Sequence, residues 1–158
     1  MRLAAHPLIV GLKQSVNFAA PGKFRDDTER ILRETRDLDF AVVSGEDTMF
    51  ASLLEMGGHG IVTASGNIPE AARLFLEIRR RFLSGDKAEA EAAQERASRF
   101  ADWVFCRKSP IPLATFFDSP LFLPLADLAE TRDGQRLSAE LKEWARREAP
   151  SVVRWWKD

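Results

Sequence analysis

Three short apolar runs alternate with longer amphipathic stretches in the first half of the chain. The runs are Leu8–Lys13, Phe40–Ser44 and Gly60–Ala64, and they are rich in β-branched residues. Continuous apolar runs of this length are typical of strands that are buried on both faces of a parallel sheet. The stretches that follow them repeat apolar residues at intervals of three and four, which predicts a helix after each strand. The alternation therefore predicts an α/β fold of three parallel strand–helix units with right-handed crossovers.

The second half of the chain shows helical patterns only. A stretch rich in alanine and glutamate predicts a long helix over about residues 86–106. A proline-rich apolar stretch, residues 108–125, predicts a short helix between two turns, and a last helix is expected over about residues 133–148. We therefore divide the chain into a strand–helix part, residues 1–85, and a helical extension, residues 86–158.

Charge, cysteine content and hydropathy narrow the class of protein. Twenty-three basic and twenty-four acidic side chains give a net charge of −1, which argues against a nucleic-acid binder. The single cysteine, Cys106, cannot form an internal disulfide, so we expect a reducing, cytoplasmic location. Two histidines and one cysteine are too few for an ordinary zinc site. No apolar run approaches the roughly 18 residues of a membrane span, so we expect no membrane partner.

Lys13 ends the first predicted strand and is the first candidate for chemistry. In barrels and open α/β sheets the reactive groups lie at the carboxyl ends of the strands. A lysine set among apolar neighbours loses solvation of its ammonium, which lowers its pKa and makes the amine a nucleophile toward a carbonyl carbon. The alternative is a solvated surface lysine, which is the commoner case after a strand.

The ends of the other two predicted strands fall in the same ring of positions. Gly45, which follows the second strand, allows the backbone to approach a ligand closely, although a strand–helix turn with a capping carboxylate is the simpler interpretation. Residues 63–67 precede a helix start that could bind a carboxylate or phosphate, or form a capped loop. The chain carries no phosphate-loop lysine motif, GxSxG elbow or HExxH motif.

Five segments together resemble the dihydrodipicolinate synthase/N-acetylneuraminate lyase family, and they occur in the family's order between about Leu3 and Ala114. They read LAAHPLIVGLKQS, FAVVSGED, EMGGHGIVTASGNIPE, SGDKAEAEAAQERA and SPIPLA. The resemblance implies a (β/α)₈ TIM barrel followed by extra helices. The three strands of this chain align with the last three of the barrel, strands six to eight.

The resemblance also implies class I aldolase-type chemistry, in which a lysine forms a Schiff base with pyruvate or another 2-oxo acid without a metal or organic cofactor. Lys13 aligns with that lysine. Gly45 aligns with a residue that lines the pyruvate pocket, and Val62 aligns with an apolar pocket residue on the last strand. Glu46 and Asp47 fall near the region that meets the variable part of the substrate.

Much of the family's site has no counterpart in this sequence. The family's threonine-rich carboxylate-binding motif and its proton-relay tyrosine both belong to the preceding part of the barrel, and this chain contains no tyrosine. A barrel takes about 250 residues. A three-stranded piece leaves two open sheet edges, so we expect self-association or pairing with a missing N-terminal half. We therefore predict an incomplete Schiff-base lyase, with a catalytically inactive fragment or interaction module of the same fold as the alternative.

Overall fold

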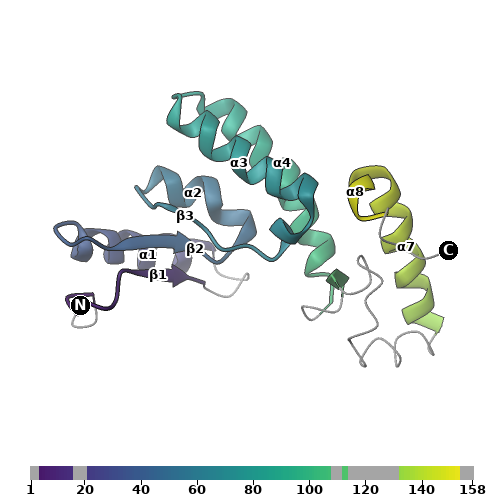
Figure 1. Cartoon of the computed structure of the whole chain (residues 1–158), viewed down its shortest axis with the longest axis horizontal. Coiled ribbons are helices and arrows are strands. Elements are labelled where there is room, and N and C mark those ends of the chain that lie inside the picture. The colour runs from purple at the N-terminus through teal and green to yellow at the C-terminus, as the bar shows by residue number, and fades with distance from the viewer. Residues whose placement is uncertain (1–3, 16–20, 108–111, 114–131, 154–158) are drawn as a thin grey trace. The chain divides into compact units, whose positions relative to one another are not determined.

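In the part of the chain that the structure describes, three parallel strands form one sheet (Figure 1). In a computed structural model of the chain, the described residues are 4–15, 21–107, 112–113 and 132–153. The strands lie in the order β1-β2-β3, with bounds Gly11–Gln14, Ala41–Ser44 and Gly60–Ile61. The register places Lys13 opposite Val43, and Val43 opposite Gly60. The predicted α/β class with parallel strand–helix units is therefore confirmed.

Each strand is followed by a helix, and further helices complete the described part of the chain (Figure 1). The helices are α1 (Pro21–Thr35), α2 (Phe50–Glu55), α3 (Pro69–Leu83), α4 (Lys87–Val104), α7 (Arg132–Glu148) and α8 (Pro150–Val153). Short 3₁₀ turns precede α2 and α3, at Asp47–Met49 and Ser65–Asn67. Gly57 and Gly85 adopt positive φ angles of 94° and 82° just after α2 and α3, a conformation that favours glycine.

The first strand is shorter and more open than the sequence predicts. β1 begins at Gly11 instead of Leu8, and Leu8 and Val10 are 85% and 72% exposed. The expectation of a strand buried on both faces is therefore wrong for this run. The physical reason is that Leu8 and Val10 precede β1 at an edge of the sheet, where no described element packs over their side chains.

One face of the sheet is covered and the other is open. Val42 and Ser44 are fully buried and Gln14 nearly so, and alternation along the strands places all three on one face. Lys13 and Val43 point to the opposite face, where Lys13 is exposed and Val43 half-buried. The covered face belongs to a core of buried side chains from the strands and α1–α3, among them Phe24, Ile31, Val42, Phe50, Leu53, Phe75 and Ile78.

The chain divides into two compact units, and each is described here by itself. The first comprises Met1–Ala64 and Leu74–Ser98, and the second comprises Ser65–Arg73 and Arg99–Asp158. Within the first unit, an ion pair joins α3 to α4, with Arg96 Nη2 at 3.1 Å from Glu77 Oε2. The division at residue 85 stays a prediction.

In the second unit, aromatic rings hold α7 against the end of α4. Phe100 meets Trp144 edge-on with ring centroids 5.0 Å apart, and Trp103 stacks on Trp144 at 5.6 Å. Glu70 of α3 accepts hydrogen bonds from both the amide and the hydroxyl of Ser151 in α8. The helix expected over residues 133–148 is present as α7, whereas most of the proline-rich stretch lies outside the described residues. None of the helices in the described ranges is long and apolar enough to cross a bilayer.

Candidate active site

Lys13 lies at the carboxyl end of β1, on the open face of the sheet. It is the third of four residues in that strand, and parallel pairing brings it level with the ends of β2 and β3. The side chain is exposed, and no described residue forms an ion pair with its ammonium. The apolar residues around Lys13 in the sequence predict a desolvated ammonium. The described residues do not remove it from solvent, because they leave the face of the sheet on which Lys13 lies uncovered. The amine is accessible to a carbonyl compound from that side.

Gly45 directly follows β2 and contacts the side chain of Lys13. A Cβ atom at this position would overlap Lys13 Cε and would lie 3.1 Å from Lys13 Cγ and 2.9 Å from Ser15 Cβ. The amide of Gly45 donates to the carbonyl oxygen of Gln14 at 2.6 Å, which fastens the turn after β2 to the end of β1. The absent side chain thus allows the lysine stem and Ser15 to pack directly on this backbone.

Glu46 is held at the same end of the sheet by two serines. The hydroxyl of Ser15 donates to Glu46 Oε1 at 2.9 Å, which joins the turn after β2 to the residue that follows β1. The hydroxyl of Ser44 donates to the carbonyl oxygen of Glu46 at 2.8 Å and accepts from its amide at 3.1 Å. These bonds fix both the backbone and the carboxylate of Glu46 at the end of the sheet that carries Lys13.

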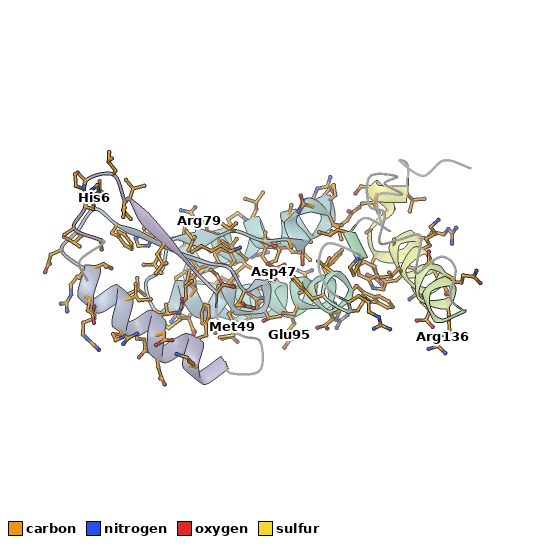
Figure 2. The ribbon with its side chains drawn as sticks, turned by 90° about the horizontal axis from the view of Figure 1, so that it is seen from below. His6, Asp47, Met49, Arg79, Glu95 and Arg136 are labelled. Carbon is orange, nitrogen blue, oxygen red and sulfur yellow. The ribbon has the colours of Figure 1, made fainter. Side chains whose placement is uncertain are left out.

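Asp47 is placed differently from its neighbour Glu46. It is 1% exposed and begins the 3₁₀ turn that leads into α2, and Figure 2 shows it among the helices of the first unit. Its carbonyl oxygen accepts from Gln94 Nε2 at 2.9 Å, while Gln94 Oε1 accepts from the amide of Ala51 at 2.9 Å. Gln94 of α4 therefore joins the 3₁₀ turn and α2 from within the core.

Val62 continues the alternation of β3 toward the open face and is 51% exposed. Its amide donates to the carbonyl oxygen of Ser44 at 2.8 Å, which keeps it beside the end of β2. The turn Ser65–Asn67, which follows, belongs to the second compact unit. Val62 thus adds an apolar surface on the side of the sheet where the lysine lies.

Sequence reasoning did not identify Ser15, Ser44 or Gln94 as parts of this arrangement. A serine two residues before a turn carboxylate is a local signal that could have indicated Ser44, because its hydroxyl can bond the backbone two residues on. Ser15 and Gln94 act across 31 and 43 residues of sequence, respectively, and become visible only once the strands and helices are paired.

A hollow of about 540 Å³ lies at the other end of the strands. The end of α1, the residues before β2 and the turn before β3 line it, and His59 is among them. His59 Nδ1 accepts a hydrogen bond from the amide of Val42 at 3.1 Å. The hollow is separate from the group around Lys13. The described residues include no group of three His, Cys, Asp or Glu side chains that could hold a metal ion.

A lysine at the carboxyl end of a strand in a parallel α/β sheet lies at the end where TIM barrels carry their active sites. A model of the dihydrodipicolinate synthetase family matches residues 1–119. The chain belongs to this family.

The relatives that match this chain include two enzymes named 4-hydroxy-tetrahydrodipicolinate synthase. The chain is 32% identical over 139 residues to 4-hydroxy-tetrahydrodipicolinate synthase from Methanoculleus marisnigri, covering 84% of this chain and 45% of the relative. It is 36% identical over 136 residues to the enzyme of the same name from Gluconacetobacter diazotrophicus, covering 82% and 43%. The chain therefore spans somewhat less than half the length of these relatives.

Solved structures show the same fold. Dihydrodipicolinate synthase from Acinetobacter baumannii, solved in complex with pyruvate, gives a TM-score of 0.72 at 22% identity and covers 92% of this chain and 47% of its own. The enzyme from Aquifex aeolicus gives 0.70 at 21% identity, covering 91% and 46%. The expectation of a partial TIM barrel with a helical extension is therefore confirmed.

Proposed function

We propose that this chain supplies the Schiff-base lysine, Lys13, of a lyase that acts on pyruvate or another 2-oxo acid. The observation that carries the proposal is the position of Lys13. It lies at the carboxyl end of a parallel strand, accessible on the open face, in a chain whose relatives are named 4-hydroxy-tetrahydrodipicolinate synthases. The pyruvate held by the Acinetobacter baumannii enzyme supports the choice of substrate class.

The chemistry needs one nucleophilic amine and an open approach to it. The neutral amine of Lys13 adds to the carbonyl carbon of the 2-oxo acid, and loss of water gives an iminium. The iminium draws electrons from the adjacent carbon, so that a proton leaves and an enamine forms. The enamine carbon then bonds to an aldehyde, and water hydrolyses the iminium to return the free lysine. Neither a metal nor an organic cofactor enters these steps.

The neighbours of Lys13 receive separate roles in the proposal. Gly45 leaves room for the lysine stem, and Val62 offers an apolar wall to the substrate. Glu46 lies where a second substrate would meet the site, with its carboxylate oriented by Ser15. Asp47, which lies in the interior, contributes indirectly by forming the turn that carries Glu46.

The open face of the sheet requires further strand–helix units before the site is enclosed. The TIM barrel has eight such units, and this chain supplies three. We propose that a complementary N-terminal half covers the face that bears Lys13, and that without it the chain associates with itself through its open edges. We place the protein in the cytoplasm, in keeping with its single cysteine.

Reductive trapping tests the lysine directly. The chain is incubated with pyruvate and sodium borohydride at several pH values between about pH 6 and pH 9. Mass spectrometry is expected to find the reduced adduct on Lys13 and to lose it in Lys13→Arg. The matched control is Lys87→Arg, which removes an exposed lysine from the start of α4. Absence of an adduct on Lys13 throughout this range, both in the chain alone and in its mixture with the N-terminal half of a relative, would overturn the proposal.

The alternative function is a catalytically inactive fragment or interaction module of the same fold. The exposed amine of Lys13 and the absence of tyrosine from the sequence favour it for this chain acting alone. Mixing the chain with the N-terminal half of a relative separates the two functions. An adduct that forms only in the mixture supports the lyase, whereas none in either sample supports the interaction module.

A further inference from the structure

We propose that the hollow at the amino ends of the strands binds a small organic acid that carries one carboxylate and an apolar body. The volume of the hollow, about 540 Å³, is within the range of small-molecule sites. Its lining residues all belong to the first compact unit, and it lies at the opposite end of the strands from Lys13. The proposal therefore concerns a second site and does not depend on a Schiff base at Lys13.

Two arginines give the hollow its positive charge. Arg33 lies in the last turn of α1, and Arg36 follows the end of that helix. Neither forms a hydrogen bond or an ion pair with a described residue, whereas Arg30 of the same helix pairs with Asp27 at 3.2 Å. The helix dipole favours basic residues at this end of a helix, which is the simpler reason for their position. It does not explain why both arginines line one hollow, where their N–H donors are available to a carboxylate.

The rest of the wall is largely apolar. Leu32, Leu38, Phe40 and Met56 line the hollow together with the arginines. Phe40 is 8% exposed and forms part of the core, but Leu38 is 39% exposed and Met56 is half-buried, so both present apolar surface to solvent. A ligand with an apolar body would remove this surface from water, which is favourable in proportion to the area covered. A simple inorganic anion would leave it exposed.

Hydrogen bonds within the chain hold both sides of the hollow in place. On one side, the amide of Leu38 donates to the carbonyl oxygen of Thr35 at 3.0 Å, and the amide of Phe40 donates to that of Leu38 at 2.9 Å. On the other side, the amide of His59 donates to the carbonyl oxygen of Val42 at 2.8 Å, while His59 Nδ1 accepts from the Val42 amide at 3.1 Å. Because Nδ1 is an acceptor, Nε2 is the donor of this ring. A preformed wall lowers the cost of ordering on binding.

Glu29 limits the charge that the ligand can carry. It lies one turn before Arg33 on α1, and it is the single carboxylate among the residues that line the hollow. Two guanidinium groups and one carboxylate leave one net positive charge on these side chains. A dianion would be repelled by Glu29, and an organic cation would be repelled by the two arginines. An apolar monocarboxylate matches both the charge and the wall.

Titration of the isotope-labelled full chain with hexanoate, followed by two-dimensional NMR, tests the proposal. We expect the amide signals of Leu38, Phe40 and His59 to shift, with a dissociation constant on the order of 1 mM, because arginines in contact with solvent bind anions weakly. Acetate has the charge without the body, and hexylamine has the body with the opposite charge. Both are expected to bind at least about tenfold more weakly than hexanoate. Inorganic phosphate that binds as tightly as hexanoate would overturn the proposal, because the apolar wall would then contribute nothing.

Variants of the lining separate the charge from the apolar wall. Arg33→Gln and Arg36→Gln are each expected to weaken hexanoate binding about tenfold, whereas Arg30→Gln, on the same helix but outside the hollow, is the matched control. Leu38→Ser is expected to weaken hexanoate about threefold and to leave acetate unchanged. Glu29→Gln removes the opposing charge and is expected to strengthen hexanoate binding about twofold. All five side chains are exposed or only partly covered, and circular dichroism checks that each variant is folded.

Lys13→Gln distinguishes the hollow from the Schiff-base site, because Lys13 is an exposed cation that could itself attract a carboxylate. Hexanoate is expected to bind this variant as it binds the parent chain. Loss of binding in Lys13→Gln, with binding unchanged in Arg33→Gln and Arg36→Gln, would place the carboxylate at Lys13 and overturn the proposal. Absence of binding to the parent chain at concentrations about tenfold above the expected dissociation constant would also overturn it. Neither result bears on borohydride trapping, so the proposed function stands or falls separately.

Discussion

A Cβ atom on Gly45 would overlap the Cε atom of Lys13, so it is a glycine that allows the lysine stem to lie across the end of β2. Lys13 and Gly45 are 32 residues apart in sequence, but β1 and β2 are adjacent in the sheet. The amide of Gly45 also donates a hydrogen bond to the carbonyl oxygen of Gln14 at the end of β1. The direction in which the amine of Lys13 projects is therefore set by a residue on the neighbouring strand–helix unit.

Gly45→Ala is expected to redirect Lys13 at a small cost in stability. The lysine end can move, but Ser15 Cβ, at 2.9 Å from the new atom, must shift with its backbone. We expect a loss of about 1 kcal/mol in the free energy of unfolding, at the low end for overpacking. Borohydride trapping of pyruvate on Lys13 is expected to slow by about tenfold, because a misplaced nucleophile loses its approach geometry.

Gly22→Ala is the matched control for this substitution. Gly22 lies in α1, and a Cβ atom there would meet nothing within 4 Å. Alanine is also the better helix former, so stability is expected to stay the same or to rise slightly. Trapping as fast in Gly45→Ala as in Gly22→Ala would show that the contact with Gly45 does not orient the lysine.

The positions of Lys13 and Gly45 could be predicted from the sequence because they depend on local patterns. Each follows an apolar run, and parallel strands bring their carboxyl ends to one edge. The exposure of Leu8 and Val10 could not be predicted in the same way. An apolar run indicates that a strand can be buried, but what buries it is the packing of other elements on its faces, which the sequence of the run does not contain.

The different surroundings of Glu46 and Asp47 also could not be predicted from sequence patterns. The two residues are adjacent and of similar chemistry, and the sequence predicts one shared role for them. Their separation arises because the chain changes from strand to 3₁₀ turn between them, which directs one side chain toward Ser15 and buries the other. A change of backbone geometry within two residues leaves no periodic signal to detect.

Gln94→Leu is expected to destabilise the first unit, although leucine and glutamine have side chains of similar volume. The amide of Gln94 bonds the carbonyl oxygen of Asp47 and the amide of Ala51, each at 2.9 Å. Leucine would leave two backbone groups without these partners, at about 1–3 kcal/mol for each buried group. We expect the free energy of unfolding measured in urea to fall by about 2–6 kcal/mol, the sum for two such groups.

Glu89→Leu is the control for that measurement, because Glu89 lies on the exposed side of the same helix. Surface changes of this kind usually alter stability by less than about 0.5 kcal/mol. Equal effects of the two substitutions would mean that the Gln94 amide does not contribute to stability through these bonds.

Val10→Lys is expected to weaken self-association of the chain without weakening its fold. Val10 is 72% exposed beside the open edge of β1, and a charge at a sheet edge disfavours pairing with another strand. The unfolding free energy is expected to change by less than about 0.5 kcal/mol. Sedimentation velocity over a range of concentrations measures the association, and Leu83→Lys, a change at a residue of α3 that is 65% exposed, is the control. If Leu83→Lys alone disperses the chain, the associating surface lies on α3 instead of the sheet edge.

Glu70→Ala is expected to release α8 from the start of α3 in the second unit. The carboxylate of Glu70 accepts from the Ser151 amide at 2.9 Å and from its hydroxyl, so the first turn of α8 depends on one side chain. Hydrogen bonds to a charged group contribute about 1.5–3 kcal/mol. Hydrogen exchange of the amides from Ser151 to Val153 is therefore expected to speed up by at least about tenfold, which corresponds to about 1.4 kcal/mol. Ser151→Ala removes the hydroxyl bond and keeps the amide bond, so its effect is expected to be smaller. If the two substitutions accelerate exchange equally, the amide bond contributes nothing and the hydroxyl alone holds α8.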